Sequence, residues 1–131
     1  MTAYGYARTE CKYNAQGLET ERAWYDGRGG LVCIDGVAKV QNEYDENGNL
    51  TKRMNFGADN RLTRDSFNVA ITCWTYDKIG QVVECRYYGP DSLPTQHRAG
   101  DALWKNEFDS TGRIVGRRHF DLNGNEVDIK E

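Results

Sequence analysis

Apolar and polar residues alternate on both sides of a turn that recurs along this chain. Around residues 45–48 the apolar side chains stand at every second or fourth position: Ala38, Val40, Tyr44, Leu50, Met54 and Phe56. Alternation with period two is typical of a half-buried β-strand. Apolar residues nowhere recur at the steps of an amphipathic helix over a helical length. The pattern therefore predicts an all-β chain with almost no helix.

An aromatic anchor occurs four times, followed at once by Asp or Asn and four positions later by Gly. The anchors are Tyr13, Tyr44, Tyr76 and Phe108, and their glycines are Gly17, Gly48, Gly80 and Gly112. Successive anchors are 31, 32 and 32 residues apart, and a second aromatic follows each anchor by 12 residues. Self-similarity at a fixed period of this length indicates a repeat protein. We expect a single domain, 1–131, with units at 5–35, 36–67, 68–99 and 100–131.

The turn after each anchor has the residues of a type I turn whose final Gly is left-handed. Positive φ is therefore predicted for all four glycines. A three-residue loop pairs each anchor with the residue six positions later, so that Tyr44 faces Leu50 and Ala38 faces Phe56. In this register the anchors share one buried face with the second aromatics, which are Tyr25, Phe56, Tyr88 and Phe120.

A second turn follows each second aromatic, as at residues 26–29 and 57–60. It sets Tyr25 opposite Leu31, so each unit reads as two longer strands and a short third strand. The predicted fold is an all-β tandem repeat of four antiparallel β-meanders of about 32 residues, stacked into an elongated twisted sheet or solenoid.

Composition narrows the possible partners. The 17 basic and 20 acidic residues are well mixed and give a net charge of −3, and no basic patch predicts nucleic-acid binding. No apolar run approaches the roughly 20 residues that a membrane-spanning helix needs. The hydrophobic fraction of 38% suits a thin, elongated core.

Candidate chemistry is sparse. The chain has no nucleophile-elbow, zinc-protease or phosphate-loop motif, and its four cysteines form no C-x-x-C pair. The Asp-rich turn at 45–49 lacks the Glu at position 12 of a calcium loop. We therefore predict no catalytic residue, no metal site and no cofactor. The open alternative is a cleft enzyme in which Cys85 pairs with His119, or Cys73 with His97.

The predicted register assigns a candidate binding surface to the third unit. On the face away from the anchors it sets Cys73 opposite Cys85, flanked by Ile71 opposite Tyr87, with Val83 nearby. Other units carry mainly charges and amides in these positions, and a contiguous apolar patch usually marks a contact site. Alternatively, the array curls and covers the patch with its own chain. Directly opposed Cys73 and Cys85 could also form a disulfide.

The motif Tyr44-Asp-Glu-Asn-Gly-Asn-Leu resembles the tyrosine–aspartate (YD) repeat of bacterial RHS-type proteins. The wider unit, from the Gly-x-Ala start to the second aromatic, is similar to bacterial tandem repeats built from β-hairpins and extends over residues 5–131. The resemblance implies extended β-sheet shells that enclose or present another polypeptide, with carbohydrate binding in some cases. This chain has a longer unit and is too short to close a shell.

Together these features predict a non-enzymatic β-repeat module that presents a binding or structural surface to a protein or glycan partner. One alternative is a structural spacer or shell segment of a larger bacterial surface or toxin-delivery protein; another is the small enzyme described above. The three tryptophans suit stacking on sugar rings and, equally, packing between units. The end units are more polar than the second unit, which suits either a complete array or a fragment cut at unit boundaries.

Overall fold

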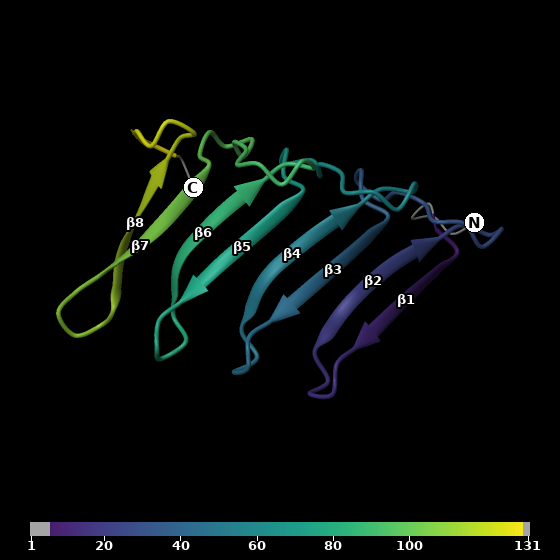
Figure 1. The fold of residues 1–131 in the computed structure, drawn as a ribbon, viewed down its shortest axis with the longest axis horizontal. Coiled ribbons are helices and arrows are strands. Elements are labelled where there is room, and N and C mark those ends of the chain that lie inside the picture. The colour runs from purple at the N-terminus through teal and green to yellow at the C-terminus, as the bar shows by residue number, and fades with distance from the viewer. Residues whose placement is uncertain (1–5, 130–131) are drawn as a thin grey trace.

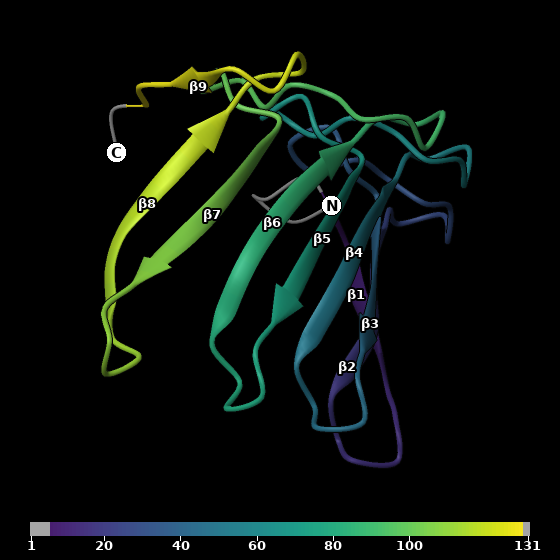
Figure 2. The same cartoon turned by 60° about the vertical axis from the view of Figure 1, so that its left-hand side comes forward.

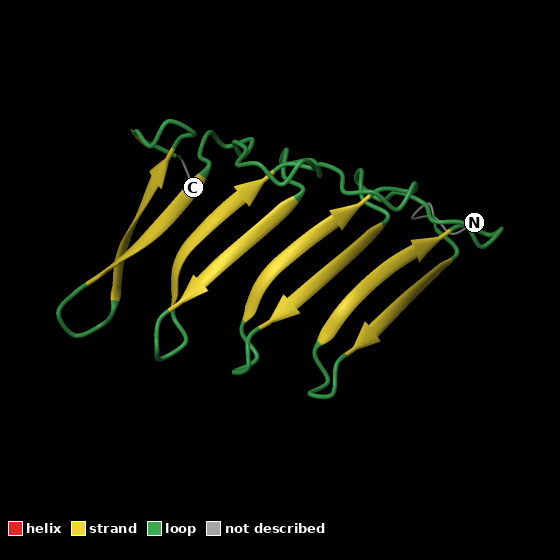
Figure 3. Ribbon diagram, viewed as in Figure 1, coloured by secondary structure: helices red, strands yellow, loops and turns green. Residues whose placement is uncertain are grey.

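The computed structural model describes residues 6–129 as one open sheet of nine antiparallel strands in chain order, and no helix occurs in this range (Figure 3). The strands are β1 (Arg8–Tyr13), β2 (Glu19–Tyr25), β3 (Lys39–Tyr44), β4 (Leu50–Phe56), β5 (Ile71–Tyr76), β6 (Val82–Tyr88), β7 (Leu103–Phe108), β8 (Ile114–Phe120) and β9 (Glu126–Val127). The all-β prediction is confirmed. Gly5 at the start of the first predicted unit, and residues 130–131 at the end of the fourth, lie outside the described residues.

Four hairpins, β1–β2, β3–β4, β5–β6 and β7–β8, stand side by side in the sheet (Figure 1). Tight turns join the two strands of each hairpin at one end of the strands. Longer connections link neighbouring hairpins at the opposite end of the strands (Figures 1 and 2). The short strand β9 pairs only with His119 and Phe120 at the end of β8. Within the described range, no helix has the length and apolar character needed to cross a bilayer.

The tight turns close as predicted. Gly48 has a φ of 84°, and its N–H donates to the carbonyl of Asp45 at 3.1 Å. The Asp45 carboxylate accepts hydrogen bonds from the N–H groups of Asn47 and Asn49, both at 2.9 Å. Gly17, Gly80 and Gly112 have φ values of 82°, 89° and 89°, so the predicted positive φ is confirmed at all four glycines. The side-chain oxygen satisfies N–H groups that the turn leaves without backbone partners, which explains why Asp or Asn follows each anchor.

Replacing Gly48 by alanine is expected to lower the free energy of unfolding by about 1–2 kcal/mol, because the left-handed conformation is costly for any residue with a Cβ. The added Cβ meets Leu18 Cδ1 at 3.5 Å, an ordinary contact, so the loss is conformational. Urea denaturation measures this loss. Gly27→Ala is the matched control, because Gly27 does not have positive φ and has open space around its added Cβ. An equal loss in both variants would contradict the explanation.

Asp109 makes the fourth tight turn sensitive to acid. The Thr111 hydroxyl, above all, and the N–H of Arg113 donate to its carboxylate at 2.6 and 3.0 Å, and they lower the pKa of Asp109 from 3.8 to about 2. Because the folded-state pKa lies below the unfolded one, this carboxylate stabilises the fold above pH ~4, and the contribution is lost as the pH falls toward 2. Melting temperatures measured across this window should fall less for Asp109→Asn than for the wild type. An NMR titration midpoint for Asp109 near its ordinary value would contradict this prediction.

Beyond the turn, the register differs from the prediction by one residue. Tyr44 pairs with Leu50 as expected, but Glu43 pairs with Lys52 because Thr51 is an extra residue in β4. Every hairpin contains such a bulge, and its extra residue is β-branched: Thr20, Thr51, Val83 and Val115. Because side chains alternate between faces, one extra residue sends the rest of the second strand to the opposite face.

The bulge separates the two sets of aromatic residues that were predicted to share a face. Tyr44 lies on one face, and Phe56, opposite Lys39, lies on the other. The predicted burial of the anchors is also wrong, since Tyr13 is 59% exposed and Tyr44 is only half-buried. Phe56 is half-buried beneath the Lys39 ammonium, which lies 4.7 Å from the ring centroid. The two aromatic sets therefore serve two different surfaces.

The connections between hairpins contain two turns each. The second turn closes as predicted, with Tyr25 bridged to Leu31 and Phe56 bridged to Leu62. A third turn precedes the next hairpin, and its left-handed residues are Gly36, Asn68 and Gly100, with φ values of 87°, 73° and 116°. The residues that mark the predicted unit starts are thus turn residues.

The core lies where these connections cross the sheet. Ala38, Ala70 and Ala102 lead into the next hairpin, and all three are buried. Ala38, for example, donates to the carbonyl of Phe56 and accepts from the N–H of Trp24. A backbone bonded on both sides leaves space for little more than a methyl group. The core is therefore thin, as predicted, and Cys85 is its largest fully buried side chain within the described residues.

Candidate functional site

One face of the sheet carries all three tryptophans. Residues that oppose each other directly share a face, and so do residues two apart in a strand. Following these steps across the sheet places six residues together: Trp24, Trp74, Trp104, Arg22, Arg53 and Arg117. We call the surface formed by these six residues the aromatic face.

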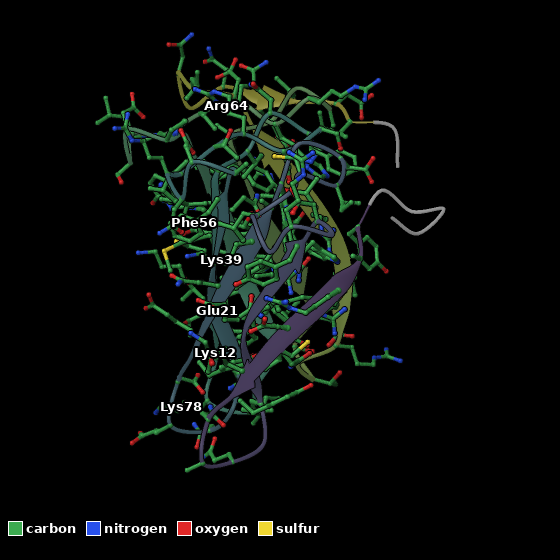
Figure 4. The ribbon with its side chains drawn as sticks, turned by 90° about the vertical axis from the view of Figure 1, so that its right-hand side faces the viewer. Lys12, Glu21, Lys39, Phe56, Arg64 and Lys78 are labelled. Atoms are coloured by element: carbon green, nitrogen blue, oxygen red, sulfur yellow. The ribbon has the colours of Figure 1, made fainter. Side chains whose placement is uncertain are left out.

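The opposite side, which we call the charged face, carries Phe56 and the residues paired with it in register. Lys12, Glu21, Lys39 and Phe56 follow one another along this side (Figure 4). The Glu21 carboxylate accepts from Gln41 at 2.8 Å and pairs with Lys12 at 3.2 Å. Gln41 first, and Lys12 after it, lower the pKa of Glu21. Because the Lys12 ammonium is exposed, such a pair stabilises a fold little, and the polar groups of the charged face bind one another.

Trp104 is held in place on two sides. The Arg117 guanidinium lies over its ring, 3.7 Å from the centroid, in a cation–π contact. The indole N–H donates to the Tyr87 hydroxyl at 3.0 Å. Arg117 Nε donates to Asn106 Oδ1 at 3.0 Å, and Asn106 Nδ2 donates to the carbonyl of Val82 at 2.8 Å. This part of the aromatic face is therefore ordered before any ligand arrives.

A second arginine–asparagine pair lies nearer the N-terminus. Arg53 Nε donates to Asn42 Oδ1 at 3.0 Å, and Asn42 Nδ2 donates to the carbonyl of Glu19 at 3.2 Å. Arg22 makes a two-point contact with the Glu19 carboxylate at 2.8 and 2.9 Å. A shallow hollow of about 360 Å³ opens over these residues beside Trp24. The hollow therefore combines guanidinium, amide and indole groups.

Trp74 separates two further hollows near the middle of the sheet. One, of about 410 Å³, extends toward the tight turns and includes Asn49 and Thr51. The other, of about 210 Å³, extends under the connections to His97. Within residues 6–129, the indole N–H groups of Trp24 and Trp74 donate no hydrogen bond, whereas that of Trp104 does. Two half-buried indoles thus keep a donor for a ligand.

An Asp–His pair supports the C-terminal end of this face. Asp101 Oδ2 and His119 Nδ1 are 2.7 Å apart, and both residues are buried. The His97 ring stacks on Phe67 with centroids 5.4 Å apart, and its Nδ1 accepts from the N–H of Ala99 at 2.9 Å. The Nδ1 atoms of both histidines are thus engaged away from the cysteines with which the enzyme alternative paired them.

The five predicted binding residues do not form one patch. Ile71 and Cys73 lie on the charged face, Cys85 and Tyr87 lie on the aromatic face, and Val83 is the extra residue of the β6 bulge. Ile71 is only 4% exposed and Cys85 only 2%, so both belong to the core. Of the five, Tyr87 alone contacts a tryptophan of the aromatic face through a hydrogen bond.

Cys73 and Cys85 are not directly opposed, as a disulfide between them would require. Cys73 pairs with Arg86 and Cys85 pairs with Trp74, so the two side chains point to opposite faces, and both thiols are free. Burial raises the pKa of the Cys85 thiol to about 12 and also raises that of Cys73. Both thiols therefore stay protonated at neutral pH, and the nucleophilic form of cysteine is the thiolate.

The arginines were not predicted from the sequence, although their spacing from the anchors marks them. An Arg stands nine residues after three of the four anchors: Arg22, Arg53 and Arg117. Aligning the units by their anchors, without assuming a hairpin register, reveals this signal.

Across residues 6–129, no group of three or more His, Cys, Asp or Glu side chains is placed to hold a metal ion. Comparison of the sequence with protein-family models finds no match, and comparison with curated proteins finds no significant match.

Proposed function

We propose that this protein is a non-enzymatic binding module that holds an extended segment of a partner protein against its aromatic face. The observation that carries the proposal is the gathering of three tryptophans and three arginines on one side of a single-layer sheet. Trp, Tyr and Arg dominate the energetic hot spots of protein interfaces. The charged face also carries arginines and tyrosines, such as Arg86 and Tyr88, but none of the three tryptophans.

The local geometry supports the same role. The Arg117–Trp104 stack is fixed by Asn106 and Tyr87, so little side-chain freedom is lost on binding, and such preorganisation improves affinity. The free indole donors of Trp24 and Trp74 suit carbonyl groups of an extended peptide. A protonated, buried Cys85 gives the alternative of a thiol enzyme no support.

We further propose that the chain is a tandem repeat of four hairpin units related to the YD repeats of RHS-type proteins. The recurring anchor turn, the β-branched bulge residue and the left-handed turn at the starts of the second, third and fourth units support this relation. An elongated array of such units would repeat its binding positions along one face, which suits an extended ligand.

Selection of displayed peptides on the wild-type protein, followed by affinity measurement, tests the function. Trp24→Ser and Trp74→Ser should each weaken binding of the selected peptides roughly 30-fold, the effect of losing about 2 kcal/mol at a hot spot. Arg53→Ala, a milder change on the same face, should also weaken binding. Thr75→Ala, on the exposed charged face, is the matched control and should bind like the wild type.

Peptides that bind all variants equally would overturn the assignment to the aromatic face. A glycan array run in parallel separates the ligand classes. If the wild type bound a glycan but no peptide, and Trp74→Ser lost the glycan binding, the assignment of the site would stand. The partner would then be a carbohydrate and not a protein.

A further inference from the structure

Neighbouring hairpins pair in one register at every junction of the sheet. The residue eight positions after an anchor pairs with the residue three positions before the next anchor: Glu21 with Gln41, Lys52 with Cys73, and Glu84 with Lys105. The carbonyls of Ala38, Ala70 and Ala102 accept N–H groups from the preceding hairpin at 3.0, 2.8 and 3.1 Å. Because backbone groups alternate in direction along a strand, the residues two positions further on also point toward the preceding hairpin.

A side-chain hydrogen bond crosses each junction as well. The acceptor is always the carbonyl of the residue six positions after an anchor, and the pairs are Tyr44 with Glu19, Tyr76 with Leu50, and Asn106 with Val82, at 2.6, 2.5 and 2.8 Å. In the first two junctions the hydroxyl of the anchor tyrosine donates, and in the first Asn42 donates to the same carbonyl. In the third, the anchor is Phe108, and the donor is Asn106, which stands two residues before its anchor as Asn42 does.

The two outer hairpins of the sheet carry the two partners of such a junction: β1 has the donor residue, and β8 has the acceptor residue. Tyr13 at the end of β1 is an anchor tyrosine and is 59% exposed. Ile114 is the residue six positions after the last anchor and is 51% exposed. Within residues 6–129, β1 pairs only with β2, and β9 covers only the last two residues of β8. Open strand edges are templates for pairing with another chain.

We propose that a second copy of this chain adds its β1 to the open part of β8, continuing the sheet in the same register. Gly116 then lies opposite Glu10 of the second copy, and the hydroxyl of that copy's Tyr13 donates to the carbonyl of Ile114. Such contact is head-to-tail, so it leaves a free edge at each end and builds linear assemblies rather than closed dimers. This inference is independent of the ligand on the aromatic face.

Charge decides how well the two edges fit. The register sets Arg8 of the second copy opposite Arg118, and like charges directly opposed are unfavourable. Each arginine already has a carboxylate partner, Glu10 at 2.7 Å and Glu126 at 2.5 Å, which reduces the repulsion. Gly116 contributes no side chain where Glu84 meets Lys105 at 3.7 Å in the third junction. This vacant position provides a sensitive test.

Sedimentation velocity of the whole chain, under reducing conditions and from low micromolar to near-millimolar concentration, tests the proposal. The wild-type mass should rise with concentration beyond that of a dimer. Thr9→Pro removes the outward N–H of the β1 edge, where proline is tolerated, and should leave the protein monomeric. Added to the wild type, this variant should shorten the assemblies. Its β8 can still pair with β1 of a wild-type copy, whereas its own β1 cannot pair with β8 of another copy.

Charge variants at the vacant position give a second, independent readout. Gly116→Lys faces Glu10 and should tighten association by roughly twofold to fivefold, whereas Gly116→Glu should weaken it by a similar factor. Adding Glu10→Lys to Gly116→Glu should restore assembly. Circular dichroism checks that each variant is folded. A wild type that stays monomeric, a dimer that does not grow, or a Thr9→Pro protein that assembles like the wild type would each overturn the proposal.

Discussion

Replacing Asp101 by alanine is expected to lower the free energy of unfolding by about 1–3 kcal/mol, the cost of leaving a buried hydrogen-bonding group without its partner. Asp101 and His119 are both buried, and their side chains meet at 2.7 Å. The change removes the partner of His119 Nδ1 in a site that water reaches poorly. Urea denaturation followed by tryptophan fluorescence measures the loss.

A double-mutant cycle separates this pair from general packing. Asp101→Ala combined with His119→Ala should cost less than the sum of the two single changes, because each single change already breaks the contact. Asp128→Ala, at an exposed carboxylate, is the control and should change stability by less than about 0.5 kcal/mol. Additive losses from Asp101 and His119 would contradict a direct contact between them.

Ile71→Ala is expected to cost about 2–4 kcal/mol, the range for a buried aliphatic side chain. Ile71 is 4% exposed on the charged face, where it lies between Met54 of β4 and Tyr88 of β6. Its removal leaves a cavity at the junction of two hairpins, and neighbouring strands held by backbone hydrogen bonds cannot close it fully. Chemical denaturation again provides the measurement.

Ile79 provides the matched control for Ile71. It is 77% exposed in a tight turn, so Ile79→Ala should change stability by less than about 0.5 kcal/mol. If Ile71→Ala proved equally mild and instead weakened a partner's binding, the sequence-based assignment of Ile71 to a contact surface would be restored and its place in the core lost.

Local turn chemistry explains how much of this fold could be predicted from the sequence. Gly48 and Asp45 specify their turn through contacts within five residues, so the left-handed glycines, the first strand pair and the absence of helix were predicted correctly. The second turn was also predicted, including the bridge between Phe56 and Leu62. Such features depend on neighbours in the chain and on little else.

The faces could not be predicted, because they depend on one extra residue. With Thr51 inside the ladder, Tyr44 and Phe56 share a face; with Thr51 bulged out, they do not. The hydrophobic pattern does not distinguish these registers, since both faces carry aromatic residues. The predicted binding patch placed Cys73 and Cys85 on one face because it used the register without the bulge. The β-branched residues at all four bulge positions are the only local mark of the correct register.

The contacts that support the site could not be predicted from local sequence patterns either. Asp101 and His119 are 18 residues apart in the chain and meet only after two strands have paired. The stack of Arg117 on Trp104 likewise requires the register of β7 with β8. Their residue types are ordinary in a polar β-protein, so the sequence alone did not single them out.

Interstrand NMR contacts of Cys85 test the central claim most directly, because the aromatic face exists only in the bulged register. Alternating backbone direction makes Trp74 and Cys85 a pair without mutual hydrogen bonds, whose Cα atoms approach to about 4.5 Å and whose Hα atoms lie close together. The structure predicts a strong Hα–Hα contact from Cys85 to Trp74. A strong Hα–Hα contact from Trp74 to Glu84 instead, the pair without mutual hydrogen bonds in the other register, would separate the tryptophans and contradict the assignment of the aromatic face.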